Sequence, residues 1–221
     1  MSLLLSAVTK FIAGFILVGA LLFLPAWSFA YMNGWLFLAL LFIPMFILGV
    51  LLYFRSPDLL KKRLNTREEN DTQKGVVAIA GLLFVCGFIV AGLDFRFGWS
   101  HVPTWMVIAA SVILLISYAL YAEVMRENAF LSRKIEIQEG QKIVTTGVYG
   151  IVRHPMYAAT IWLFLSIPLV LGSWWSLLCF LPYIPVIVIR IINEEMLLKS
   201  ELEGYNEYTR KVKYRLIPFI W

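Results

Sequence analysis

The stretch "MYAATIWLFLSIPLVLGSWWSLLCFLPYIPVIVI", Met156–Ile189, is almost unbroken in its apolar character. As a single α-helix it would extend roughly 50 Å, which exceeds the hydrocarbon core of a bilayer, about 30 Å thick. Gly172 and Ser173 interrupt the run with two residues that favour turns. We therefore predict a helical hairpin of two short membrane spans, 156–171 and 174–192.

Aromatic and proline residues agree with this hairpin. Trp174–Trp175 directly follow the break, where an interfacial anchor is expected. Pro168, Pro182 and Pro185 would kink the two helices, which membrane bundles tolerate when neighbouring helices satisfy the freed carbonyls. Similar apolar runs upstream bring the total to about six spans of the required length of about 20 residues. The expected spans are 8–28, 34–54, 75–94, 103–123, 156–171 and 174–192.

Composition indicates one membrane domain over residues 1–221. The chain is 61% hydrophobic, whereas soluble domains contain roughly 45–50% apolar residues. Its N-terminus lacks a basic region before the apolar run, so we expect a retained first span rather than a signal peptide. Cys86 and Cys179 lie inside apolar runs and are expected to be buried small hydrophobes. The fold class expected is all-α, a polytopic integral membrane helical protein.

The positive charges predict the orientation. Lysine and arginine gather in the 54–74 loop, the 124–155 segment and the C-terminal tail, whereas the opposite connections hold only Arg96. Because cytoplasmic loops carry the excess of these residues, we expect both termini at the cytoplasmic face. The net charge of +5 is explained by this bias, and no nucleic-acid partner is expected.

A polar motif precedes the hairpin in "IVTTGVYGIVRHPMY", Ile143–Tyr157. His154 stands before a proline and is biased towards an extended backbone, while Pro155 suits the first helical position. The helix start, together with Arg153 and His154, can hold a carboxylate or phosphate. An ordinary interfacial helix start with a cytoplasmic arginine explains the same residues.

A second polar motif follows the hairpin in "RIINEE", which begins at Arg190. Arg190 and Glu194 are four residues apart and share a helix face, and Glu195 lies one step round. Arg190 follows an apolar run, and ionisable residues at such depth usually face a polar cavity or a partner. An Arg–Glu pair that merely ends the span is the alternative.

The tail "EGYNEYTRKVKYRLIPFIW", Glu203–Trp221, reads as a short amphipathic helix followed by a basic and then an apolar segment. It is typical of an interfacial helix on anionic lipid. The functional alternative is a lid that folds back over a site.

The ordered set of these motifs, from Lys142 to Pro218, resembles the isoprenylcysteine carboxyl methyltransferase and phospholipid methyltransferase superfamily of membrane enzymes. The resemblance implies an enzyme that uses S-adenosylmethionine at the cytoplasmic face, with spans and a loop in 1–130 and the donor-binding region in 131–221. Ala158–Ala159 depart from the family pattern, in which glycine often follows the tyrosine. The donor-binding residues implied are Gly147, Tyr149, Arg153, His154, Pro155, Tyr157, Glu194, Glu195, Tyr205 and Tyr208, with Arg215 also in the tail match.

The resemblance also implies a lipidic or hydrophobic methyl acceptor, with Arg190 and Glu194 as catalytic residues. O-methylation of an isoprenylcysteine-like carboxylate is favoured, because Arg190 can position a carboxylate. N-methylation of a phospholipid amine is the alternative, with Glu194 or Glu195 as the base. No cysteine, histidine and carboxylate group has metal-ligand spacing, so no metal is expected.

Two other classes stay open. Membrane sterol-type reductases have a comparable cytoplasmic pocket and use NADPH, whose 2′-phosphate would require cations such as Arg210, Lys211 and Lys213. A non-enzymatic scaffold or small transporter would account for an intramembrane Arg190. Few polar residues interrupt the first four spans, however, so no transport path is visible in them.

Overall fold

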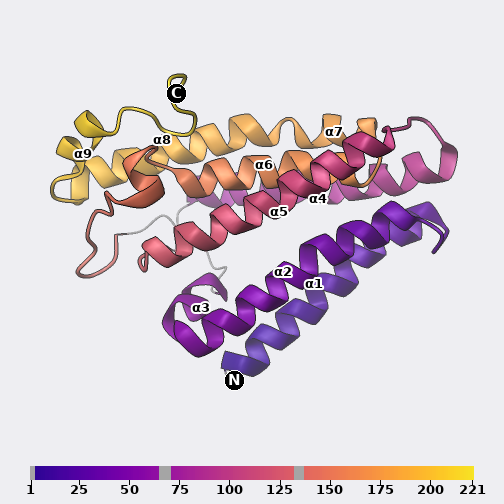
Figure 1. Ribbon diagram of the computed structural model, residues 1–221, viewed down its shortest axis with the longest axis horizontal. Coiled ribbons are helices and arrows are strands. Elements are labelled where there is room, and N and C mark those ends of the chain that lie inside the picture. Colours follow the sequence, from indigo (N-terminus) through magenta and orange to yellow (C-terminus); the bar gives the residue numbers. More distant parts are fainter. Residues whose placement is uncertain (1–2, 65–70, 132–136) are drawn as a thin grey trace.

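The computed structural model describes residues 3–64, 71–131 and 137–221, apart from the side chains of 71–73. Within these ranges the chain is helical and contains no strand. The helices run roughly along one long axis, with α1 and α2 forming a pair beside a bundle of α4, α5, α6 and α8 (Figure 1). The helices are α1 (Leu3–Ala26), α2 (Met32–Arg55), α3 (Pro57–Leu64), α4 (Asp71–Phe97), α5 (Thr104–Glu127), α6 (Pro155–Val170), α7 (Trp174–Phe180), α8 (Tyr183–Glu201) and α9 (Tyr205–Lys211).

The expected class of polytopic helical membrane protein is confirmed. Five described segments are long and apolar enough to cross a bilayer: α1, α2, α4 from Lys74, α5, and the combined segment Trp174–Glu201. The sixth, α6, has 16 residues and spans about 24 Å at 1.5 Å per residue, so it is shorter than a typical span. In hydrocarbon a helix satisfies its own backbone polar groups, and this explains why such apolar runs are helical.

The hairpin forms where the sequence predicts it. Helix α6 ends at Val170, and Gly172 adopts φ +79°, a left-handed conformation that favours glycine. A Cβ at this position would lie 2.6 Å from the side-chain nitrogen of Asn33. Ser173 then caps α7, because its Oγ accepts a hydrogen bond from Ser176 N at 3.0 Å. The second limb is divided in two, since Pro182 separates α7 from α8.

Asp94 ties this turn to the neighbouring connection. Its side chain is buried and accepts hydrogen bonds from Ser100 N at 2.7 Å, from the Ser100 hydroxyl and from the Ser173 hydroxyl. The indole nitrogen of Trp174 donates to the carbonyl of His101 at 3.1 Å. These bonds fix the end of the bundle that lies opposite α9.

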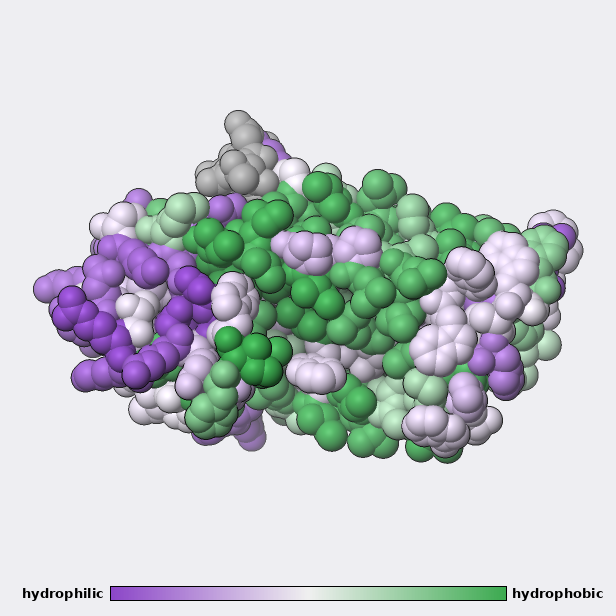
Figure 2. All heavy atoms as spheres, turned by 90° about the horizontal axis from the view of Figure 1, so that it is seen from above, coloured by the Kyte–Doolittle hydropathy of each residue, from purple (hydrophilic) through white to green (hydrophobic). Residues whose placement is uncertain are grey.

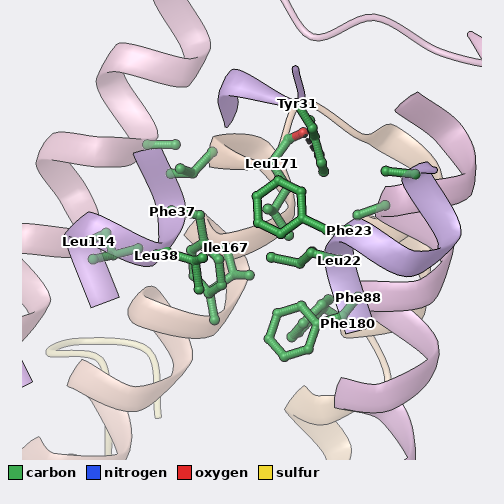
Figure 3. Packing of buried hydrophobic residues seen from close by; sticks show 14 of the residues in the cluster. Leu22, Phe23, Tyr31, Phe37, Leu38, Phe88, Leu114, Ile167, Leu171 and Phe180 are labelled. Carbon is green, nitrogen blue, oxygen red and sulfur yellow. Dashed lines mark hydrogen bonds between the residues drawn. The ribbon is translucent and has the colours of Figure 1, made fainter. Parts of the chain in front are cut away.

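The main apolar core lies where α1, α2, α4, α5, α6 and α7 meet. Leu22, Phe37, Phe88 and Phe180 come together there from four different helices (Figure 3). Tyr31 closes the core towards the hairpin turn, because its hydroxyl donates to the Leu171 carbonyl at 2.6 Å. Helices α4 and α1 come into close contact at Gly92, where a Cβ would lie 3.1 Å from the backbone nitrogen of Ala26.

Hydrophilic residues gather at one end of the molecule, the end that holds α9, and hydrophobic residues cover its length (Figure 2). That end also contains α3 and the segment that leads into α6 (Figure 1). The polar motifs before and after the hairpin therefore meet at one end of the bundle.

The close contact at Gly92 gives a test of the helix packing. A Cβ there would lie 2.5 Å from the backbone oxygen of Leu22, and backbone cannot move aside cheaply. We expect Gly92→Ala to lower the free energy of unfolding by about 1–3 kcal/mol, as overpacking does. The measurement is the midpoint of thermal unfolding in detergent micelles.

Gly81→Ala in the same helix is the matched control, because a Cβ there meets nothing within 4 Å. This substitution should leave the midpoint unchanged or raise it, since alanine favours the helix. Equal midpoints for the two variants would contradict the close α1–α4 packing.

Candidate functional site

The site begins where the tail returns to the start of α6. The short helix η1 (Gly147–Gly150) turns the chain, and the backbone N–H groups of Arg153 and His154 then donate to the carbonyls of Tyr214 and Arg215, both at 2.9 Å. Pro155 occupies the first turn of α6, where its missing N–H costs nothing. The tail is therefore bonded to the motif before the hairpin.

A buried carboxylate joins the two motifs and the tail. Glu195 of α8 is 2% exposed, and its Oε1 accepts from Arg153 Nε at 2.7 Å and lies 3.3 Å from His154 Nε2. Its Oε2 accepts from Arg215 Nε at 3.0 Å and lies 3.5 Å from Lys199 Nζ. Three separate segments thus place cationic or imidazole nitrogens on one buried carboxylate.

The Arg153 side chain is bonded to both α8 and the tail. Besides Glu195, it binds the tail through Nη1, which donates to the carbonyls of Val212 and Lys213, both at 2.8 Å. Arg153 lines the cavity and is bonded directly to Glu195, so this side chain joins the start of α6 to both α8 and the tail.

A second polar group lies next to the first. The hydroxyl of Tyr157 in α6 donates to Glu194 Oε2 at 2.6 Å and accepts from Arg190 Nε at 3.0 Å. The expected Arg190–Glu194 helix face is therefore bridged by a tyrosine from the other limb of the hairpin. This arrangement places a cation, a phenol and a carboxylate in one short chain of hydrogen bonds.

A cavity adjoins both groups at the hydrophilic end of the bundle. Leu198 of α8, Leu202 directly after this helix, and Ile143 and Val144 of the loop before η1 provide apolar walls. The predicted site residues that line the cavity are Tyr149, Arg153, His154, Pro155, Tyr157, Glu194, Tyr205 and Tyr208.

The tail tyrosines close the cavity. Tyr208 donates to the carbonyl of Tyr149 at 2.6 Å, whereas the buried hydroxyl of Tyr205 has no hydrogen-bond partner within the ranges that the structure describes. Burial raises the pKa of the Tyr205 and Tyr208 phenols, and it raises that of Tyr149 to about 12. All three phenols are therefore neutral hydrogen-bonding groups near pH 7. The tail therefore folds back over the cavity.

Three predicted residues are not among those that line the cavity. Glu195 is in the buried ion cluster, and Arg190 donates to the hydroxyl of Tyr157, which does line the cavity. Gly147 has φ +52°, and a Cβ there would overlap the carboxylate of Glu127, which accepts from Val148 N at 3.2 Å. Gly147 therefore shapes the turn into η1 rather than lining the cavity.

Sequence reasoning missed Asn128, which lines the cavity and donates to the Tyr149 hydroxyl at 3.0 Å. Its Oδ1 also accepts from Phe130 N at 3.0 Å, an Asx turn that ends α5. An asparagine directly after a long apolar helix indicates a cap. Only the fold brings it opposite the tail.

Fold and site together define a helical membrane protein with a polar pocket at the hydrophilic end of its bundle. The phospholipid methyltransferase family model matches residues 104–203, from α5 to the end of α8. The match confirms the resemblance to the integral membrane methyltransferase superfamily that includes isoprenylcysteine carboxyl methyltransferases, and it supports a membrane methyltransferase.

The chain also matches part of a curated relative whose name gives a different activity. The Delta(14)-sterol reductase TM7SF2 of Mus musculus is 28% identical over 93 residues, which is 37% of this chain and 20% of the relative. The chain therefore corresponds to about a fifth of that protein's length.

The buried carboxylate gives a stability prediction. Glu195→Gln keeps the side-chain shape but removes the negative charge, which leaves the Arg153 guanidinium buried without its counter-ion. Losing one partner of a buried ion pair typically costs about 3–5 kcal/mol. We expect a clearly lower thermal unfolding midpoint in detergent micelles.

Glu201→Gln, at the exposed end of the same helix, is the control and should leave the midpoint nearly unchanged. If both variants melt together with the wild type, Glu195 does not hold the tail.

Proposed function

We propose that the protein transfers a methyl group from S-adenosylmethionine to a lipidic or hydrophobic acceptor in the cavity between α6, α8 and the tail. The observation that carries this proposal is the convergence of three motifs, distant in sequence, on one cavity next to Glu194. The match to the phospholipid methyltransferase family model supports the reaction class.

The chemistry of the lining fits this donor. S-adenosylmethionine carries a carboxylate, an ammonium group, ribose hydroxyls and an adenine ring. The unpartnered Tyr205 hydroxyl and the Glu194 carboxylate can hydrogen-bond its polar groups, and the side chains of Leu198 and Leu202 suit a flat ring. A buried phenol without a partner is costly, so a polar ligand that supplies the missing bond is expected at Tyr205.

When bound, S-adenosylmethionine supplies an electrophilic methyl group on its sulfonium sulfur. The chain aligns donor and acceptor and excludes water, and such positioning can contribute much of the rate enhancement. Displacement at the methyl carbon breaks the bond to sulfur and forms a bond to an acceptor oxygen or nitrogen.

We favour a carboxylate acceptor, as in O-methylation of an isoprenylcysteine-like group. Such a carboxylate is already nucleophilic and needs only to be positioned, and the guanidinium of Arg190, oriented by Tyr157, suits it. In the alternative, an amine acceptor must lose a proton, and Glu194 is then the base. In either case we place this end of the bundle, and both termini, at the cytoplasmic face, following the positive charges.

The match to a sterol reductase gives one alternative activity that should be tested, an NADPH-dependent reduction. Arg210, Lys211 and Lys213, the cations that would receive a 2′-phosphate, are not among the residues that line the cavity. Thermal-shift measurements with each ligand separate the two functions. Stabilisation by NADPH, with none by S-adenosylmethionine or S-adenosylhomocysteine, would overturn the methyltransferase proposal.

Tyr205 provides a sharp test of donor binding. Tyr205→Phe removes a hydroxyl that has no partner among the described residues, so the ligand-free protein should be as stable as the wild type or more so. The affinity for S-adenosylhomocysteine, measured by titration calorimetry, should fall up to about tenfold, the worth of one hydrogen bond.

Tyr208→Phe is the contrasting variant, because it loses the bond to the Tyr149 carbonyl. It should lower the thermal midpoint of the free protein. An unchanged affinity in Tyr205→Phe would show that the donor does not reach this hydroxyl.

Transfer of a labelled methyl group into total lipid and protein extracts identifies the acceptor. If the acceptor is a carboxylate, Arg190→Gln should reduce transfer more than tenfold, because a charge-assisted contact to the acceptor is lost. Glu194→Gln should then have a smaller effect. Label on an amine, with Glu194→Gln the more damaging change by about 10²-fold or more, would instead establish N-methylation.

A further inference from the structure

The last residues of the chain form a small hook, Ile217–Trp221, that presents apolar side chains outward. Phe219 is 87% exposed, Ile220 76% and Ile217 46%. Exposure of adjacent large apolar side chains is unfavourable in water and marks a contact surface when the residues are contiguous.

The hook has a defined conformation. The backbone N–H groups of Leu216 and Ile217 donate to the carbonyl of Trp221 at 2.9 and 3.1 Å, which closes the loop. Phe219 adopts φ +67°, a left-handed conformation that bulky residues rarely take. Its ring lies 5.3 Å from that of Tyr214, centroid to centroid. A strained, closed loop that points an aromatic side chain outward invites a functional explanation.

The surroundings of the hook indicate its partner. Leu216, directly before it, packs against Tyr183, Ile187 and Ile191, so the hook lies on the flank of α8 rather than over the end of the bundle (Figure 1). Ile189 and Ile192 of the same helix are also exposed apolar residues.

The charged residues near the hook also indicate the kind of surface that it contacts. Arg210, Lys211 and Lys213 precede it and are exposed. In the view onto this flank, hydrophobic atoms border directly on the hydrophilic end (Figure 2). Apolar side chains beside lysine and arginine are typical of segments that lie in the headgroup boundary of an anionic leaflet.

We propose that the hook inserts Ile217, Phe219 and Ile220 into the headgroup boundary of the bilayer that the helices span, and thereby holds the tail over the cavity. The link to the cavity is Arg215. Its guanidinium carbon lies 5.0 Å from the ring centroid of Trp221, and its Nε binds Glu195 at 3.0 Å. Burial of the hook in lipid therefore fixes the residue that closes the ion cluster.

Accessibility of a nitroxide spin label tests the insertion. Phe219→Cys is labelled in a Cys86→Ser, Cys179→Ser background and reconstituted in phosphatidylcholine–phosphatidylglycerol vesicles. Collision with oxygen, which concentrates in lipid, and with a water-soluble nickel chelate is measured by power saturation. The control label is at Glu203, an exposed position in the turn before α9.

We expect high oxygen and low nickel accessibility at position 219, with the opposite ratio at position 203. Equal, water-like ratios at both positions would overturn the proposal. Low accessibility to both reagents at position 219 would also overturn it, since that result means the hook is covered by protein, such as a second copy of the chain.

The link to the cavity rests on the proposed donor site and has its own measurement. Phe219→Asp with Ile220→Asp should weaken binding of S-adenosylhomocysteine severalfold in vesicles, whereas Phe219→Leu with Ile220→Leu should leave it unchanged. Equal affinities for the two double variants would overturn the link. A wild-type protein that binds no S-adenosylhomocysteine would count against the proposed function, while the accessibility measurement would still decide the insertion.

Discussion

The carboxylate of Glu195 is the contact on which the hydrophilic end of the molecule depends. It lies in α8 yet binds Arg153 from the start of α6 and Arg215 from the tail. A buried carboxylate is tolerated only when it is paired and hydrogen-bonded, so its partners are constrained to meet it. The ion cluster therefore determines where the tail lies and, through the tail, where Tyr205 and Tyr208 close the cavity.

The opposite end of the hairpin is fixed by a different kind of bond. Asp94 accepts only from backbone and hydroxyl donors among its described contacts, and these come from the connection after α4 and from the hairpin turn. The two ends of the hairpin are therefore fixed by different contacts. Asp94 and Ser173 fix the turn, and Glu195 joins the two free ends of the hairpin, so that Tyr157 of one limb meets Arg190 and Glu194 of the other.

Hydropathy was sufficient to predict the helical spans and the break at Gly172, because a bilayer imposes length and apolarity on each span. It could not predict that Gly92 brings α4 against α1, because this contact depends on which helices are neighbours. Lipid and protein interiors are equally apolar, so a hydrophobic run does not indicate its partner. The paired glutamates show the same limit. Both were expected to bind the donor, whereas in the fold Glu195 belongs to the ion cluster and Glu194 lines the cavity.

The family match ends at residue 203, but the site does not. The carbonyls of Tyr214 and Arg215 accept from the backbone of Arg153 and His154, and the carbonyls of Val212 and Lys213 accept from the Arg153 side chain. All four contacts use the tail backbone, which any sequence supplies as long as it follows the same path. A tail can therefore vary in its side chains and still complete the wall of the cavity, provided that it retains a cation for Glu195 and an anchor that holds it in place. The tail side chains that meet the cavity and the ion cluster are accordingly few, since Tyr205 and Tyr208 line the cavity and Arg215 binds Glu195.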